Sequence, residues 1–389
     1  MDTGGLDKVA ELGLGTGARR EQMLMSPGPT RIPPPVLQAL ARPILHHRAP
    51  DFQAALRRVR AGLQEIAHTE NEVVLLACTG TAAMESAVVN LCDRDDAVAV
   101  VSAGYFGERW ITLAERYGCD VVPVRYEWGS IPSADDLQRA LLARPDVKVV
   151  FVVHSETSTG VVIDLEAFAA VAKSAGALFA VDTVSSFAAV PIEVDAWGVD
   201  VLVSSSHKAL MTPPGIAFVI PSRAALEAAR RTSTPRFYFD WESNLTPQLA
   251  DNPETWFSAA VSLVVGLDVA LGCIRAEGLD AVHERHVRLG RRCRAGVKAL
   301  GLELFSPDDD TAAIMTAVRM PEGVDSSAVV RTMHDDWGVT VADGEARLKG
   351  NIIRVGHLGH VGDDDVERAV AALGAAIAGA ARVLEADVA

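Results

Sequence analysis

The strongest constraint on the fold is a series of short, apolar, β-branched segments that alternate with helix-like segments through the middle of the chain. Strands joined through helices form right-handed crossovers, and these build a mainly parallel sheet covered by helices. The sequence therefore predicts an α/β fold whose large domain surrounds a mainly parallel seven-stranded sheet. The expected strands lie near residues 73–77, 97–101, 120–124, 148–153, 177–182, 200–205 and 216–220.

The length of 389 residues is sufficient for one large domain and a smaller one. We expect a mobile N-terminal extension at 1–22, a large domain at 23–298 and a smaller C-terminal α+β domain at 299–389. An aperiodic segment rich in aromatics and proline, 232–258, is expected to be an ordered loop. A long helical stretch over about 260–299 would connect the two domains.

Composition argues against several classes of partner. The formal charge of −15 argues against nucleic-acid binding. Five cysteines without CxxC spacing predict neither a disulfide framework nor a thiolate metal site, and they favour the reducing cytoplasm. The longest strongly apolar run, 147–154, is too short to span a bilayer, so no membrane partner is expected. His283 and His286 lack further ligands nearby, so no metal is predicted.

Two ionisable residues stand where predicted strands end. Asp182 closes ALFAVD, and Lys208 follows the strand that ends in SSS. Either residue alone would more often be a solvated charge or a cap. Together they would lie at the carboxyl edge of the sheet, where open α/β sheets bind ligands. A lysine amine near a buried carboxylate indicates Schiff-base chemistry on a cofactor whose ring nitrogen needs an anion, and the candidate is pyridoxal phosphate.

A third element supports this interpretation. In segment 75–91 an apolar strand turns through Thr79, Gly80 and Thr81 into a helix. Glycine allows the tight turn, and the free N–H groups of the first helical turn, with the two hydroxyls, suit a phosphate. The pattern is neither GxGxxG nor a Walker loop, so it supports a phosphate site only in combination with Asp182 and Lys208.

Motifs spread over residues 26–359 carry a resemblance to a known family. They are SPGPT (26–30), HHRAPDF (46–52), CTGTAAMESAVVN (78–90), HSETSTGV (154–161), AVDTVSSF (180–187), SSSHKALMTPPG (204–215) and RVGHLG (354–359). In this order they resemble the fold-type I pyridoxal-phosphate enzymes of aminotransferase class V. The resemblance is closest to the alanine–glyoxylate and serine–glyoxylate (serine–pyruvate) aminotransferase group.

The resemblance implies roles for individual residues. Arg354 corresponds to the residue that binds the substrate carboxylate, and Phe106 to the aromatic residue that stacks on the cofactor ring, often Trp in relatives. Thr157 resembles the hydroxyl near the cofactor's phenolic oxygen, while Ser206 and His207 resemble phosphate or ring contacts. The glyoxylate group commonly has Gln before the lysine, whereas His207 resembles the cysteine desulfurase branch of the class.

The family resemblance also implies a homodimer with its active sites at the interface. In such dimers a loop of the other subunit contributes a Tyr and a Thr to the phosphate site. The matching stretch here, PETWFSAAVSL (253–263), offers Thr255 and Ser258 instead. The hydroxyls remain but the Tyr is absent, so the phosphate anchoring is expected to differ.

These features predict an aminotransferase that moves an amino group from a small alanine- or serine-like amino acid to an α-keto acid such as pyruvate or glyoxylate. Lys208 and Asp182 would be its catalytic residues. The alternatives are a C–S β-lyase or a decarboxylating deaminase, which His207 and the missing Tyr favour, and a pyridoxamine–pyruvate aminotransferase. A catalytically silent homologue is a further alternative, against which the presence of Lys208, Asp182 and Arg354 argues.

Overall fold

The computed structural model describes residues 22–388, so all but Gln22 of the predicted extension at 1–22 lies outside the described residues. Its main feature is a seven-stranded sheet with the order β2-β10-β9-β8-β5-β3-β4. Only β10 runs against the others, being antiparallel to both β2 and β9. The predicted mainly parallel sheet is thus confirmed. Its strands are β2 (Val74–Leu76), β3 (Ala97–Ser102), β4 (Asp120–Arg125), β5 (Val149–Val153), β8 (Leu178–Asp182), β9 (Val201–Ser205) and β10 (Ala217–Pro221).

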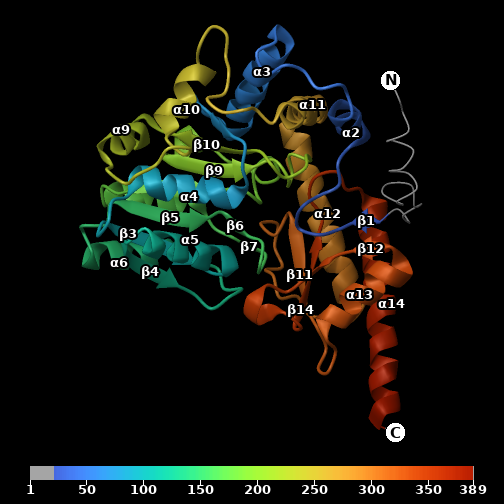
Figure 1. Ribbon diagram of the computed structural model, residues 1–389. Coiled ribbons are helices and arrows are strands. Elements are labelled where there is room, and N and C mark those ends of the chain that lie inside the picture. Colours follow the sequence, from blue (N-terminus) through green and yellow to red (C-terminus); the bar gives the residue numbers. More distant parts are fainter. Residues whose placement is uncertain (1–21, 389) are drawn as a thin grey trace.

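Helices cover both faces of this sheet (Figure 1). Strand β5 shows why: Val149, Phe151 and Val153 belong to one apolar cluster, while Val150 and Val152 belong to another on the opposite face. Because side chains alternate along a strand, a wholly apolar run needs a core on each side. The helices are α3 (Pro50–Ala67), α4 (Gly80–Leu91), α5 (Tyr105–Arg116), α6 (Ala134–Ala143), α7 (Leu165–Ser174), α8 (Val194–Trp197) and α9 (Arg223–Arg231).

The segment 232–258, expected to be a loop, contains the helix α10 (Trp241–Gln248). The carboxylate of Asp240 caps its first turn by accepting the Ser243 N–H, and the fully buried Trp241 packs against the large sheet's core. The helix is short and contains Pro247, so its sequence shows little of the apolar periodicity that predicts a helix. Tertiary burial of one large aromatic residue stabilises it instead.

The stretch expected to be one long helix forms two, α11 (Val261–Glu277) and α12 (Leu279–Ala299). They meet at Gly278, whose φ of 89° breaks the helical path. Beyond them lies a three-stranded antiparallel sheet of order β11-β14-β13. Its strands are β11 (Met315–Arg319), β13 (Ala342–Asp343) and β14 (Ile352–Gly356), and the neighbouring helices are α13 (Ser326–Trp337) and α14 (Asp363–Val388).

The start of the described chain packs with its end. Strand β1 (Met23–Leu24) pairs in parallel with β12 (Val339–Thr340). Met23 and Met25 join an apolar cluster otherwise formed by residues of 289–376. The domain division at 298/299 remains a prediction. The remaining elements are α2 (Pro34–Leu40), the two-stranded pair β6 (Ser155–Glu156) and β7 (Val161–Val162), and the 3-10 turn η1 (Ala346–Leu348). Every described helix is too short or too polar to cross a bilayer.

Candidate active site

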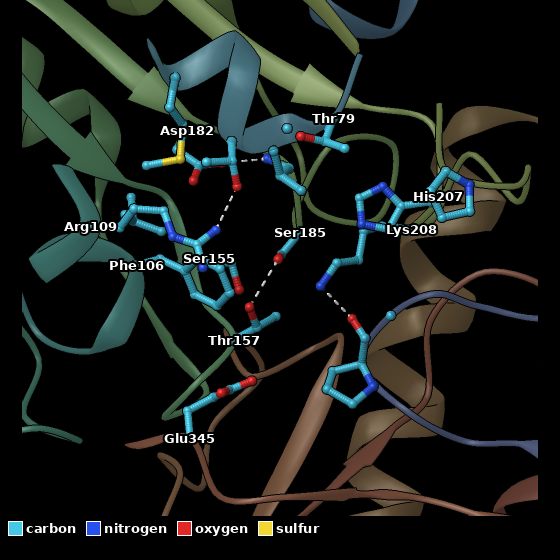
Figure 2. A pocket seen from close by; sticks show the side chains of 18 of the residues that line it. Thr79, Phe106, Arg109, Ser155, Thr157, Asp182, Ser185, His207, Lys208 and Glu345 are labelled. Carbon is cyan, nitrogen blue, oxygen red and sulfur yellow. Dashed lines mark hydrogen bonds between the residues drawn. The ribbon is translucent and has the colours of Figure 1, made fainter. Parts of the chain in front are cut away.

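A cavity of about 300 Å³ opens where the carboxyl ends of β8 and β9 face the small sheet (Figure 2). This is the edge at which the sequence predicted a site. The structure brings together nine of the predicted residues there: Thr79, Gly80, Thr81, Phe106, Thr157, Asp182, His207, Lys208 and Arg354. Lining residues that the sequence did not single out include Gly28, Arg109, Ser155, Ser185 and Glu345.

Lys208 extends into this cavity from the turn after β9. Its Nζ donates a hydrogen bond of 2.6 Å to the carbonyl of Pro27 (Figure 2). Gly28 lies against the lysine stem, because a Cβ there would collide with the Lys208 side chain. Burial, and then the positive charge of Arg354, lower the pKa of the Lys208 amine to about 8. At pH 7 about a tenth of the amine is therefore neutral, which is the form that a nucleophile or proton acceptor requires.

Asp182 is the last residue of β8 and is buried on the opposite side of the cavity from Glu345 (Figure 2). Its Oδ1 accepts a hydrogen bond of 2.8 Å from the Val184 N–H. Burial, with the nearby charge of Glu156, raises the pKa of Asp182 to about 6. No ion pair within residues 22–388 includes Asp182. A cationic ring nitrogen placed beside this carboxylate would stabilise its charged form.

The N-terminus of α4 forms another part of the cavity wall. Gly80 is required there, because a Cβ would come within 2.7 Å of Val184 Cγ2. Thr79 precedes the first turn, whose free N–H groups are donors suited to an anion. Arg109 brings a positive charge to the same place, since its Nη1 donates to Thr81 Oγ1 at 2.7 Å. These groups fit the phosphate of pyridoxal phosphate.

The aromatic side chain of Phe106 is placed by a buried acid that the sequence analysis missed. Glu156 Oε2 accepts the N–H groups of Phe106 and Gly107 at 3.0 and 3.1 Å, which caps α5. Gly104 allows this approach, because a Cβ there would collide with Glu156. The guanidinium of Arg109 lies 4.7 Å from the Phe106 ring centroid. One signal was available, namely a charged residue inside the small, polar run HSETSTGV.

Arg354 reaches the cavity from the middle strand of the small sheet. Its Nε donates to the Asp343 carbonyl at 2.8 Å and its Nη1 to the Thr157 carbonyl at 3.0 Å. Its Nη2 pairs with Glu345 Oε1 at 2.9 Å. These contacts fix the plane of the guanidinium and join the small sheet to the turn between β6 and β7.

The two residues before Lys208 differ in orientation. His207 lines the cavity, and its Nδ1 lies 2.9 Å from Ser205 Oγ. Burial lowers the pKa of His207 to about 4, so its imidazole is neutral at pH 7. Ser206 does not line the cavity, since its buried hydroxyl donates to the Pro213 carbonyl at 3.3 Å. Thr157 Oγ1 accepts a hydrogen bond of 3.3 Å from Ser185 Oγ.

Thr255 and Ser258 lie outside this chain's cavity. The Thr255 hydroxyl donates to the Phe257 carbonyl at 2.5 Å. Their predicted role in the site of a partner subunit is a contact between subunits, so it remains a prediction. Within the described part of the chain, no group of three or more His, Cys, Asp or Glu residues has the arrangement of a metal site.

Comparison with known proteins gives the family. Residues 22–357 match the Aminotransferase class-V family. The chain is 40% identical to a protein of Synechococcus sp. named "Soluble hydrogenase, small subunit", over 92% of this chain and 93% of that one. It is 34% identical to the serine–glyoxylate aminotransferase of Methylorubrum extorquens, over 90% and 89% of the two chains. The crystal structure of alanine–glyoxylate aminotransferase from Nostoc sp. matches with a TM-score of 0.89 at 32% identity, covering 95% and 98% of the two chains.

The predicted resemblance is therefore confirmed by sequence and by fold. The strand-end carboxylate, the buried lysine and the helix N-terminus meet in one cavity, as a bound pyridoxal phosphate would require. The chain belongs to the aminotransferase class V family of fold-type I enzymes and is a pyridoxal-phosphate-dependent aminotransferase.

Proposed function

We propose that this enzyme transfers an amino group from a small α-amino acid such as alanine or serine to a small α-keto acid such as pyruvate or glyoxylate. The observation that carries the proposal is the position of Arg354 in the same small cavity as Lys208. A volume of about 300 Å³ is at the lower end of the range for small-molecule sites. The cofactor occupies part of this space, which favours a substrate with a short side chain.

Arg354 would bind the carboxylate that amino and keto acids share. A guanidinium has five N–H donors, and the three hydrogen bonds to the chain leave one on each terminal nitrogen. Two remaining donors on a plane held by the Asp343 and Thr157 carbonyls can hold both oxygens of a carboxylate. This orients the substrate Cα relative to Lys208.

Lys208 would carry the proton during transfer. Pyridoxal phosphate, when bound, supplies an electron sink for the substrate carbanion. The lowered pKa of about 8 leaves part of the Lys208 amine neutral, so it can accept the Cα proton and return it to the carbon that keeps the amino group. Asp182, with its charge stabilised by a cation, would hold the proton on the ring nitrogen.

A single-turnover experiment tests this proposal. Holoenzyme mixed with alanine or serine and no keto acid should release one equivalent of the matching keto acid per site, with no ammonia. Pyruvate or glyoxylate added afterwards should restore the starting absorption spectrum. Continuous ammonia release from a cysteine conjugate, with no reaction of alanine or serine, would instead establish a lyase.

We also propose a homodimer in which Thr255 and Ser258 approach the partner's phosphate site. The proposal is supported by the position of both residues outside their own chain's cavity and by the exposed Phe237 and Trp256 side chains beside them. Light scattering should give twice the chain mass of 41.2 kDa, and a monomeric active enzyme would contradict the proposal.

The five free cysteines are consistent with a cytoplasmic location, which we likewise propose.

A further inference from the structure

The carboxylate-binding end of the cavity already contains a carboxylate of the chain itself. Glu345 lines the cavity on the small-sheet side (Figure 2). Its Oε1 accepts a hydrogen bond of 2.9 Å from Arg354 Nη2, so the charge of the arginine is matched before a substrate binds. The pairing places a negative charge one hydrogen bond away from the group that would hold the substrate carboxylate.

The backbone around Glu345 is tightly held. Gly344 lies so close to the Leu348 carbonyl that any Cβ would collide with it. The Asp343 carboxylate accepts hydrogen bonds from both Ser326 and Ser327 and from the Gly344 N–H. The Glu345 side chain is 37% exposed, and its carboxylate is held at Arg354 by their ion pair. Its negative charge therefore stays near the Arg354 end of the cavity.

Among residues 22–388, Arg354 is the one cation that forms an ion pair with Glu345. Among the residues that line the cavity, the other positive side chains are Lys208 and Arg109. Lys208 Nζ is bonded to the Pro27 carbonyl, and Arg109 is bonded to Thr81 at the N-terminus of α4. Arg347 follows two residues after Glu345, but its guanidinium stacks on Trp128, 4.1 Å from the ring centroid, and it does not line the cavity.

We propose that Glu345 determines specificity by excluding substrates with a second carboxylate. An amino or keto acid with one carboxylate needs only Arg354, whereas a four- or five-carbon dicarboxylic acid would bring a second negative charge into the small cavity that Glu345 lines. Like charges confined to one partly buried cavity repel more strongly than they would in water. The inference rests on the proposed function, because it assumes that Arg354 binds the substrate carboxylate.

The test uses unreactive acids, so that it does not depend on turnover. Propionate and succinate are titrated into the holoenzyme by calorimetry, for the wild type, Glu345→Gln, Glu345→Asp and Glu242→Gln. Glu242 is a matched control, because it pairs with Arg230 on the surface outside the cavity. Glu345→Gln should raise the affinity for succinate relative to propionate at least tenfold. Glu345→Asp, which keeps the charge, and Glu242→Gln should leave this ratio within about twofold of the wild type.

Each contrary result has a distinct meaning. An unchanged succinate-to-propionate ratio in Glu345→Gln would overturn the inference while leaving the proposed function intact. Weaker propionate binding in Glu345→Gln would also overturn it, by showing that Glu345 only holds Arg354 in place. A wild type that binds neither acid would remove Arg354 as the carboxylate site and both proposals with it. A raised succinate-to-propionate ratio in Glu345→Gln, in an enzyme that does not react with alanine or serine, would support the exclusion of dicarboxylates by Glu345 and refute the proposed substrates.

Discussion

The two walls of the cavity are built in different ways. On the large-sheet wall, Asp182 is the last residue of β8, and Lys208 follows the adjacent parallel strand β9. On the small-sheet wall, Arg354 lies in the middle of the antiparallel strand β14, opposite Ala317 and Ala342. The first wall would act on the bonds that change, and the second would recognise the carboxylate that does not. Substitutions on the two walls should therefore affect kcat and KM differently.

The largest effect is expected for Lys208→Ala on the large-sheet wall. If Lys208 transfers the proton as proposed, its loss should lower kcat on the order of 10²- to 10⁴-fold and abolish the visible absorption of covalently bound cofactor. Absorption spectra and steady-state kinetics measure both quantities. Lys173→Ala, an exposed lysine near the end of α7, is the control and should behave as the wild type. Full turnover in Lys208→Ala would place the chemistry elsewhere.

Asp182→Asn should have the next largest effect. Removing the charge beside the ring nitrogen is expected to lower kcat by about 10²- to 10³-fold, with a much smaller change in KM. The surface substitution Asp120→Asn breaks only the exposed pair with Arg144 and serves as the control. A rise in KM at constant kcat would assign Asp182 to substrate binding and remove the contrast between the walls.

Arg354→Ala tests the small-sheet wall. Loss of a charge-assisted contact of roughly 1.5–3 kcal/mol should lower kcat/KM for alanine about 10- to 150-fold, mainly through KM. Reaction with an amine that lacks a carboxylate should be nearly unchanged. Arg319→Ala removes an arginine of the neighbouring strand β11 that stacks on Phe305, and it should alter neither substrate's kinetics. Equal losses for both substrates would contradict a carboxylate-binding role.

The pH dependence of cofactor attachment tests whether the charge of Arg354 on one wall affects the pKa of Lys208 on the other. Burial lowers the pKa of Lys208 to about 8, and the amine is reactive only above its pKa, when it is neutral. The rate at which apoenzyme attaches cofactor should therefore rise about fivefold from pH 7 to pH 8 and then level off. Because the charge of Arg354 contributes to this lowering, Arg354→Ala should move the profile to higher pH. An unshifted profile would show that the two walls are electrostatically independent.

The smallest effect is expected for His207→Gln. With its pKa lowered to about 4, the imidazole is neutral at pH 7 and contributes a hydrogen bond with Ser205 rather than a charge. A neutral hydrogen bond is worth about 0.5–1.5 kcal/mol, so kcat/KM should change by less than about tenfold. Steady-state kinetics on alanine and serine measure the change. A change in the reaction itself, from amino transfer to release of ammonia, in His207→Gln would make His207 the determinant of reaction type.

Residues of the large-sheet wall were predictable because each follows a strong local pattern. The buried runs before Asp182 and Lys208 identify strand ends, and Thr79–Thr81 marks a strand-to-helix turn. Arg354 was assigned through the family resemblance, because NIIRVGHLG alone is typical of a strand with one surface charge. Glu156 and Glu345 were missed, since their contacts with α5 and Arg354 join segments that show no shared local pattern.

By itself the sequence determined the order of strands and helices and the edge of the sheet at which the site would form. A run of apolar, β-branched residues is a local property, and parallel strands necessarily end on one edge. The helix α10 depended on tertiary packing, and the break between α11 and α12 depended on the backbone angle of Gly278. Only the tertiary structure placed Glu345 against Arg354 and turned Ser206 away from the cavity, because side-chain contacts depend on how distant segments pack.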